Sequence, residues 1–205
     1  MGLIFIPLHN SILKPKAMEN RYNYIFTNGL RMGGLLGAIF ILLSLIYYIA
    51  DFNMMNAVFG IVNFLVVIAI YVIYLRWANI DLRNKYLNGW QTYPEGLLHA
   101  FLIGLVAAVI SSAYNYLFYA FFDPEYLTKM GEKVLEMLEN NPSIPQQALE
   151  EAERKIEGMT PAKTALQGFY YSAAMSFFFA LIVSAFTKKK KDIFEVADIQ
   201  NTDEV

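Results

Sequence analysis

The chain has 205 residues, of which 57% are hydrophobic and only 17% are charged, and its net charge at pH 7 is −2. Soluble domains usually carry about 25% charged residues, and the positive mean hydropathy of +0.37 also argues against a soluble domain. Without a basic domain the chain is not expected to bind nucleic acid, and without cysteine it has no disulfide, thiolate metal site or cysteine nucleophile.

Four long segments, 29–50, 52–75, 97–122 and 164–187, are almost free of charged residues. Each reaches the roughly 20 mostly apolar residues that a helix needs to cross a bilayer. Four such segments in 205 residues leave too little chain to cover them in a soluble fold. The sequence therefore predicts an all-α membrane protein with four transmembrane helices, whose first expected partner is the lipid bilayer.

The basic residues between these segments predict the orientation of the chain. They lie before the first segment, between the second and third, and after the fourth: Lys14, Lys16, Arg21, Arg76, Arg83, Lys85 and Lys188–Lys191. The short connection around Asp51 has none. Because Lys and Arg accumulate on the cytoplasmic side, we expect both termini there. Residues 1–28 would form a cytoplasmic N-terminal arm, and residues 188–205 a cytoplasmic lysine run with a polar tail.

The segment 123–163, between the third and fourth predicted spans, is expected outside the cytoplasm. It carries nine acidic and five basic residues. Apolar residues recur at helical spacing from Leu127 to Leu138 and again from Leu149 to Ile156, on either side of a break at Asn140–Ser143. This pattern predicts an acidic extracytoplasmic helical hairpin.

Two residue pairs are expected to start helices at the ends of this segment. Asp123 is a favourable N-cap residue and Pro124 suits the first helical position, which predicts the start of the hairpin. Thr160 and Pro161 repeat the pattern and predict the start of the fourth span.

Small residues recur every four positions in three of the predicted spans. They are Gly29, Gly33 and Gly37 in the first, Gly104 and Ala108 in the third, and Gly168, Ser172, Ser176, Ala180 and Ser184 in the fourth. Such residues allow the backbones of membrane helices to approach closely. The pattern fits packing within one four-helix bundle and also a homo-oligomer interface, and the bundle is the favoured interpretation.

Five polar residues could meet inside the membrane: Asn56, Asn63, Ser111, Asn115 and Gln167. Hydrogen bonds between helices, worth about 0.6 kcal/mol each on average, are the favoured explanation. The alternative is a polar cavity for a small solute or a lipid. No Asp or Glu lies deep in a predicted span, which argues against ion-coupled transport.

His99 lies near Glu95 at one end of the third span, and the two side chains could share a proton. One His and one Glu form no recognisable triad, and no metal-binding spacing such as HExxH is present. No catalytic residue, metal site or cofactor is therefore expected, and an enzyme is the least favoured hypothesis.

The layout resembles the domain-of-unknown-function family 4199, small membrane proteins found mainly in Bacteroidetes-type bacteria. The likeness rests on Asn28-Gly29-Leu30, on the third span with Phe122-Asp123-Pro124, on Gly158-Met159-Thr160-Pro161, and on Ala185-Phe186-Thr187 followed by lysines. It covers about residues 20–191. It implies a bacterial inner-membrane location with the hairpin in the periplasm, and it brings no activity.

Two functional hypotheses follow from these features. The favoured one is a non-enzymatic scaffold or accessory subunit that binds other envelope proteins through the hairpin or the small-residue faces. The alternative is a facilitator for a small solute or lipid that uses the intramembrane polar residues.

Overall fold

A computed structural model describes residues 10–50 and 57–191 of the chain. Its helices are α1 (Asn10–Ile49), α2 (Ala57–Tyr86), α3 (Tyr93–Leu117), a π-helical turn (Phe118–Phe122), α4 (Tyr126–Glu139), α5 (Gln146–Glu157) and α6 (Pro161–Thr187). These residues form no strand. Four helices are long and apolar enough to cross a membrane, over Asn20–Ile49, Val58–Tyr86, Tyr93–Phe122 and Pro161–Thr187. The predicted all-α fold with four spans is confirmed.

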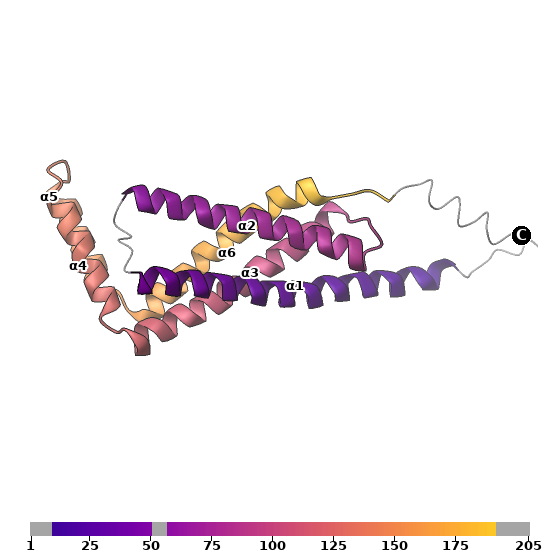
Figure 1. Cartoon of the computed structure of the whole chain (residues 1–205), viewed down its shortest axis with the longest axis horizontal. Helices are drawn as coiled ribbons and strands as arrows, with labels where there is room; N and C mark the ends of the chain where they lie inside the picture. Colours follow the sequence, from indigo (N-terminus) through magenta and orange to yellow (C-terminus); the bar gives the residue numbers. More distant parts are fainter. Residues whose placement is uncertain (1–9, 51–56, 192–205) are drawn as a thin grey trace, which may run out of the picture.

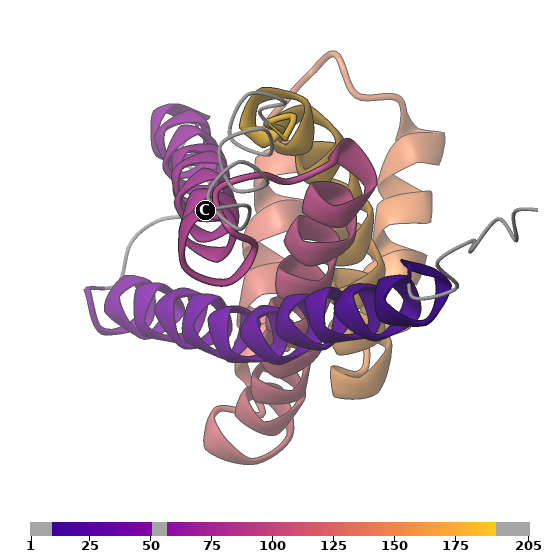
Figure 2. The same ribbon diagram turned by 90° about the vertical axis from the view of Figure 1, so that its right-hand side faces the viewer.

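Helix α3 is the centre of the bundle. It packs most extensively against α6 and α1, whereas α2 makes fewer contacts, chiefly with α6. In Figure 1, α1 runs along one side and α2 along the other, and α3 and α6 cross obliquely between them. The end-on view of Figure 2 shows the same arrangement, with α1 crossing over α3.

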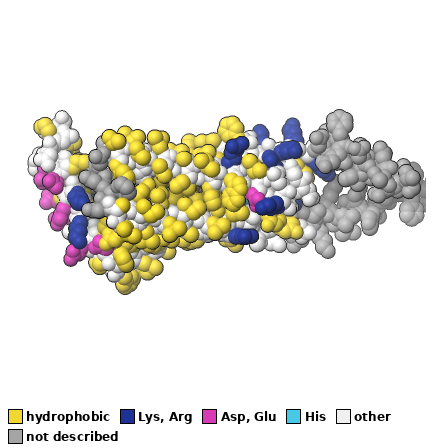
Figure 3. Space-filling view, viewed as in Figure 1, with side chains coloured by type: hydrophobic (Ala, Val, Ile, Leu, Met, Phe, Trp, Pro, Cys, Tyr) yellow, Lys and Arg dark blue, Asp and Glu magenta, His cyan; other side chains and the backbone are white. Residues whose placement is uncertain are grey.

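The core is a narrow seam along α3, and most of the apolar surface faces outward. Leu36, Leu75, Ile103 and Ala180 are fully buried. Large apolar side chains cover the outside of the four long helices, and Figure 3 shows them over the middle of the face in view, between the two charged ends. A soluble protein rarely exposes so large a patch, whereas hydrocarbon covers it at no cost.

The first two spanning helices are longer than their apolar segments suggest. Helix α1 begins at Asn10 and continues without a break into the span, so residues 10–28 are helical. Helix α2 continues past Leu75 to Tyr86 and ends with basic residues in its last turn, where they complement the helix dipole. Polar residues on these extensions are buried between the helices.

The connection from α2 to α3 is a tight turn, and its sequence explains its shape. Asn88 and Gly89 both adopt positive φ, at 55° and 79°, a region that glycine and asparagine tolerate best. The Gly89 N–H donates to the Arg83 carbonyl at 2.9 Å, which closes the end of α2. This turn returns the chain directly into α3.

Helices α4 and α5 form a hairpin at the opposite end of the bundle (Figure 1). Gly131 of α4 lies directly against the side chain of Ile156 of α5. The contact is so close that a Cβ at position 131 would collide with the Ile156 side chain. Helix α5 has no buried residue. The hairpin therefore projects from the bundle and is held together mainly by its own contacts.

One predicted helix cap is wrong and the other matches the structure. Helix α4 begins at Tyr126 with Glu125 as N-cap, so neither Asp123 nor Pro124 starts it. The Asp123 carboxylate instead accepts a hydrogen bond from the Tyr48 hydroxyl of α1 at 3.1 Å, which removes it from the helix end. Thr160 does cap α6: its hydroxyl accepts from the Lys163 N–H, and Pro161 occupies the first turn.

Candidate functional site

The least ordinary site in the molecule is a set of buried polar side chains near the α2–α3 turn and the C-terminus of α6. We call this the basic end of the bundle, and the end that carries the α4–α5 hairpin the acidic end. The set comprises Arg21, Asn28, Asn79, Glu95, His99 and Thr187, and we call it the polar clamp. It draws on all four spanning helices.

His99 is at the centre of the clamp and is fully buried. Its Nδ1 lies 2.7 Å from the Asn79 Oδ1 of α2, and its Nε2 lies 2.9 Å from the Asn28 Oδ1 of α1. The imidazole of α3 therefore bridges the two helices on either side of it. Buried polar groups need such partners, because an unpaired one retains the full cost of its desolvation.

The hydrogen bonds of Asn79 determine which nitrogen of His99 carries a proton. The Asn79 Nδ2 donates to the Gly96 carbonyl at 3.3 Å and to the Thr187 hydroxyl at 3.1 Å, so its Oδ1 must accept from His99 Nδ1–H. If both ring nitrogens are protonated, His99 donates to the Asn79 and Asn28 oxygens in their present positions. A neutral ring satisfies both once the Asn28 amide is turned by 180°, since its Nε2 is then an acceptor.

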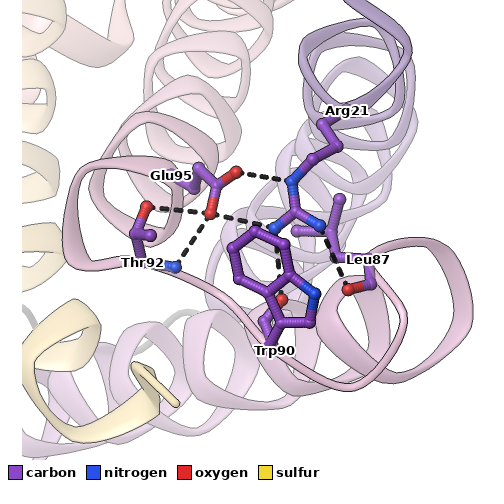
Figure 4. A network of polar contacts seen from close by, with 5 residues as sticks. All are labelled: Arg21, Leu87, Trp90, Thr92 and Glu95. Atoms are coloured by element: carbon purple, nitrogen blue, oxygen red, sulfur yellow. Dashed lines mark hydrogen bonds and ion pairs between the residues drawn. The ribbon is translucent and has the colours of Figure 1, made fainter. Parts of the chain in front are cut away.

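Arg21 and Glu95 form the outer half of the clamp (Figure 4). The Arg21 Nε donates to Glu95 Oε1 at 2.8 Å and its Nη2 donates to Oε2 at 3.1 Å, a bidentate pair between α1 and α3. The two side chains are only 14% and 11% exposed. This geometry is the strong form of the Arg–carboxylate interaction.

Arg21 and Glu95 also contact the α2–α3 turn and the start of α3. Arg21 donates to the carbonyls of Leu87 and Trp90 at 3.2 Å each, and its guanidinium carbon lies 3.6 Å from the centre of the Trp90 ring. Thr92 donates to Glu95 Oε2 through both its N–H and its hydroxyl, at 2.8 Å each. The pair thus fastens α1 to the α2–α3 turn.

The end of α6 is fixed to the same turn through its backbone. Gln91 and Lys189 form an antiparallel bridge, with N–H to carbonyl distances of 3.0 and 2.9 Å. Arg83 donates to the Thr187 carbonyl at 2.9 Å. The exposed lysine run therefore begins at a fixed position, and Figure 3 shows Lys and Arg gathered toward this end.

The predicted pairing of His99 with Glu95 is wrong. Both oxygens of Glu95 are engaged by Arg21 and Thr92, and both nitrogens of His99 face asparagine amides. The hypothesis of an enzyme depended on a proton shared between these two residues. Across the described residues, no three His, Asp or Glu side chains are grouped in a way that could hold a metal ion.

Most of the small residues lie at contacts within the bundle. A Cβ at Gly29, Gly33 or Gly37 would touch α3, at Leu102, Val106 and Ile110 respectively, and one at Gly104 would collide with Ser176 of α6. Ala108 and Ala180 are buried, and Ser172 is half-buried and its backbone carbonyl accepts from the Ser176 hydroxyl. Gly168 faces open space. A homo-oligomer interface remains a prediction.

The structure describes four of the five intramembrane polar residues, and their surroundings differ. Asn56 lies outside the described residues, and Gln167 is exposed. Asn63 of α2 and Ser111 of α3 each have a buried side-chain oxygen without a hydrogen-bond partner in the structure. Asn115 lines a small cavity of about 50 Å³ together with Ser44 and several tyrosines.

That cavity lies at the acidic end, beside the start of the hairpin. Tyr126, the first residue of α4, lines it and stacks on Tyr119 with ring centres 5.7 Å apart. Burial and the nearby charge of Asp123 raise the pKa of the Tyr126 hydroxyl above its ordinary value, so it remains a neutral hydrogen-bonding group. The aromatic contacts here attach the hairpin to the bundle.

The sequence contained partial signals for the clamp. Thr92 and Glu95 have the T-x-x-E spacing of a capping box, which marks the start of α3. Asn79 and Gln91 lie between the second and third apolar segments, where polar residues are ordinary in an exposed loop. In the structure Asn79 is buried on the extension of α2, and Gln91 is buried in the turn that bridges to Lys189. As a basic residue ahead of the first span, Arg21 predicts topology, and nothing in its surroundings in the sequence identifies Glu95 as its partner.

Four long apolar helices joined in one bundle define a multi-pass helical membrane protein. Residues 31–189 match the family model described as "Protein of unknown function (DUF4199)", and the chain belongs to that family. The resemblance stated from the sequence is thereby confirmed. Arg21 and Asn28 of the clamp precede the matched residues. Neither a curated protein nor a solved structure was found to match the chain.

Proposed function

We propose that the protein is a non-enzymatic scaffold or accessory subunit of an envelope complex in the bacterial inner membrane. Its clamp fixes the bundle at one end, and its hairpin binds partner proteins at the other. Both termini lie in the cytoplasm and the hairpin lies in the periplasm. The positive-inside rule supports this orientation, because Arg76, Arg83, Lys85 and the lysine run are all close to the basic end.

The observation that carries the proposal is the unburied hairpin. Every side chain of α5 is at least partly exposed, and in α4 only Leu127 and Gly131 are buried. Met137 is 47% exposed although it is apolar and lies outside the spanning segments. A protruding amphipathic pair of this kind offers a partner protein both apolar and acidic contacts.

Partner binding can be tested at single residues. A photo-crosslinking amino acid placed at Met137 should give a protein adduct in the source membrane, identified by mass spectrometry. The matched control is the same probe at Ile73, which is 68% exposed on α2 within a spanning segment and should give lipid adducts. Lipid adducts alone at both positions would contradict the scaffold proposal.

The orientation has its own test. Because the chain has no cysteine, single cysteines at Glu136 and Lys189 can be labelled without a background. An impermeant maleimide should label the first from the periplasmic side of intact cells and the second only after the membrane is opened. The reverse pattern would invert the proposed topology.

The alternative, a facilitator for a small solute or lipid, is supported by one observation. The buried oxygens of Asn63 and Ser111 lack partners, as groups that meet a transient polar ligand would. Replacing Asn63 with Leu separates the two hypotheses. A facilitator would lose transport with its bundle intact, whereas a scaffold would keep its partner adducts.

A further inference from the structure

Arg31 of α1 is an exposed basic residue inside a spanning helix, and the fold gives it no partner. It lies in the span Asn20–Ile49, next to Leu30 and Leu35, which are 55% and 49% exposed. None of the hydrogen bonds or ion pairs among the described residues involves Arg31. A charged side chain on a spanning helix is costly unless it finds a partner or reaches the lipid headgroups.

Two other arginines of the basic end are engaged by the fold. Arg21 binds the Glu95 carboxylate, and Arg83 donates to the Thr187 carbonyl. These contacts hold helices together, whereas Arg31 has no such contact. Because side chains lean toward the N-terminus of their helix, the guanidinium of Arg31 reaches back toward the basic end, where the apolar surface of the spans meets the charged surface.

Helix α2 lies beside Arg31 and presents a second cation there. The Tyr74 hydroxyl donates at 2.8 Å to the carbonyl of Met32, the next residue after Arg31. Farther along α2, the Lys85 side chain is 65% exposed, and its ammonium is close enough to Arg31 for the two positive charges to repel each other. Lys85 pairs with Asp81 at 2.6 Å. Two cations and one carboxylate therefore leave a net charge of +1 on this face.

We propose that Arg31 and Lys85 bind the phosphate of one anionic phospholipid in the leaflet at the basic end. The phosphodiester of such a lipid carries one negative charge, which complements the net charge of this face. The planar guanidinium of Arg31 donates two parallel hydrogen bonds to phosphate oxygens, a geometry that suits it, and Lys85 adds a point charge. Basic sites between spanning helices recur in lipid recognition. Exposed apolar side chains border the site, so its occupant is a lipid rather than free phosphate.

Trp77 of α2 places the rest of the lipid. Its side chain is 51% exposed, and its ring centre lies 5.6 Å from that of Tyr74, whose hydroxyl binds the backbone next to Arg31. Tryptophan favours the boundary between headgroups and hydrocarbon. With the phosphate at Arg31, the acyl chains of the bound lipid therefore lie against the indole ring, which makes Trp77 a local probe of the site.

The test measures quenching of Trp77 fluorescence by lipids whose acyl chains carry bromine. Trp90→Phe in the full chain leaves Trp77 as the one tryptophan, and this protein is reconstituted into phosphatidylcholine vesicles. A small fraction of brominated phosphatidylglycerol, which is anionic, should quench Trp77 more strongly than the same fraction of brominated phosphatidylcholine. The preference should be roughly fivefold, the effect of one basic residue near an anionic lipid.

Two arginine variants, made in the same background, show whether the preference belongs to this site. Arg31→Gln should abolish it and, because Arg31 has no partner in the protein, should leave unchanged the SDS fraction at which half the protein unfolds. Arg76→Gln is the matched control. It removes another exposed arginine of α2, nine residues before Lys85, which is about two and a half turns and therefore the opposite face of the helix. The control should keep the preference.

Each other outcome would overturn the proposal. Equal quenching by the two brominated lipids would show that no anionic headgroup is selected. Equal losses in the two arginine variants would show that lipid follows the total charge of the basic end. No quenching by either lipid would show that protein, such as a second copy of the chain, covers Trp77. A lower SDS midpoint in Arg31→Gln would show that Arg31 has a partner within the protein.

Discussion

The two ends of the bundle differ in how far their ion pairs are buried. At the basic end, Arg21 and Glu95 are nearly buried and form a bidentate pair. At the acidic end, Lys129 and Glu125 form a pair at 3.0 Å whose side chains are 58% and 78% exposed. The first pair fixes one relative position of α1 and α3, whereas the second lies within four residues of one segment and fixes nothing beyond it.

This difference matters because only the exposed pair can replace its hydrogen bonds by hydrogen bonds to water. A polar group buried among apolar helices has no water to return to, so its partner is obligatory. An exposed pair exchanges its contact for water at little cost. The basic end is therefore expected to determine the arrangement of the spans, and the acidic end to remain free to meet other molecules.

The largest effect is expected from Glu95→Ala. This change leaves the Arg21 guanidinium almost buried without its counter-ion and removes the acceptor of Thr92. Breaking a buried pair from one side typically costs about 3–5 kcal/mol. We expect a loss of unfolding free energy of about 3 kcal/mol, measured by SDS titration in mixed micelles. Glu125→Ala at the acidic end is the control and should leave the midpoint unchanged; equal losses would remove the contrast between the ends.

The next largest effect is expected from His99→Leu. Leucine removes the bridge between Asn28 and Asn79 and leaves one polar atom of each amide buried without its partner. An unsatisfied buried group costs about 1–3 kcal/mol, and we expect a loss of about 2 kcal/mol in the same titration. Adding Asn28→Leu removes one of the stranded amides, so the double variant should recover part of the loss. If the double variant loses the sum of the two single effects, the bridge is not the cause.

The contrast between the ends also explains what the sequence could and could not predict. The four spans follow from composition and length, because an apolar run of about 20 residues has the length and composition of a transmembrane helix. The hairpin follows from apolar residues at helical spacing and from the break between its two helices, but its predicted cap at Asp123 and Pro124 does not hold, and Tyr48 of a distant helix engages the Asp123 carboxylate. These are local features, and local features are visible in a sequence.

The polar clamp is not local. Arg21 and Glu95 are 74 residues apart, and Asn28 and His99 are 71 residues apart. The same residue types are also common in exposed loops and as basic residues that determine topology, so they do not by themselves predict a buried network. The glycine spacing of α1 did predict a close helix contact, but only the structure shows that its partner is α3 of the same chain.

Adjacent glycines of α1 provide a smaller effect with a built-in control. A Cβ at Gly33 would lie 2.6 Å from Val106 Cβ and 2.8 Å from the Ile103 carbonyl oxygen, whereas one at Gly34 would meet nothing within 4 Å. Overpacking a tight contact costs about 1–3 kcal/mol. Gly33→Ala should therefore destabilise the bundle by about 1–2 kcal/mol, and Gly34→Ala should not. If Gly34→Ala instead disrupts a homo-oligomer on a native gel, α1 has a second packing face.

The smallest effect on the whole molecule is expected from Ile156→Ala, which acts only within the hairpin. Ile156 packs against Gly131, and α5 has no buried residue. Its truncation should open the hairpin locally, because protection from exchange reflects local unfolding where contacts are few. Deuterium uptake should rise over residues 126–157 and stay unchanged in the spanning helices, and the SDS midpoint should not move. If uptake also rises around His99, the two ends are energetically coupled, and binding at the hairpin could then alter the clamp.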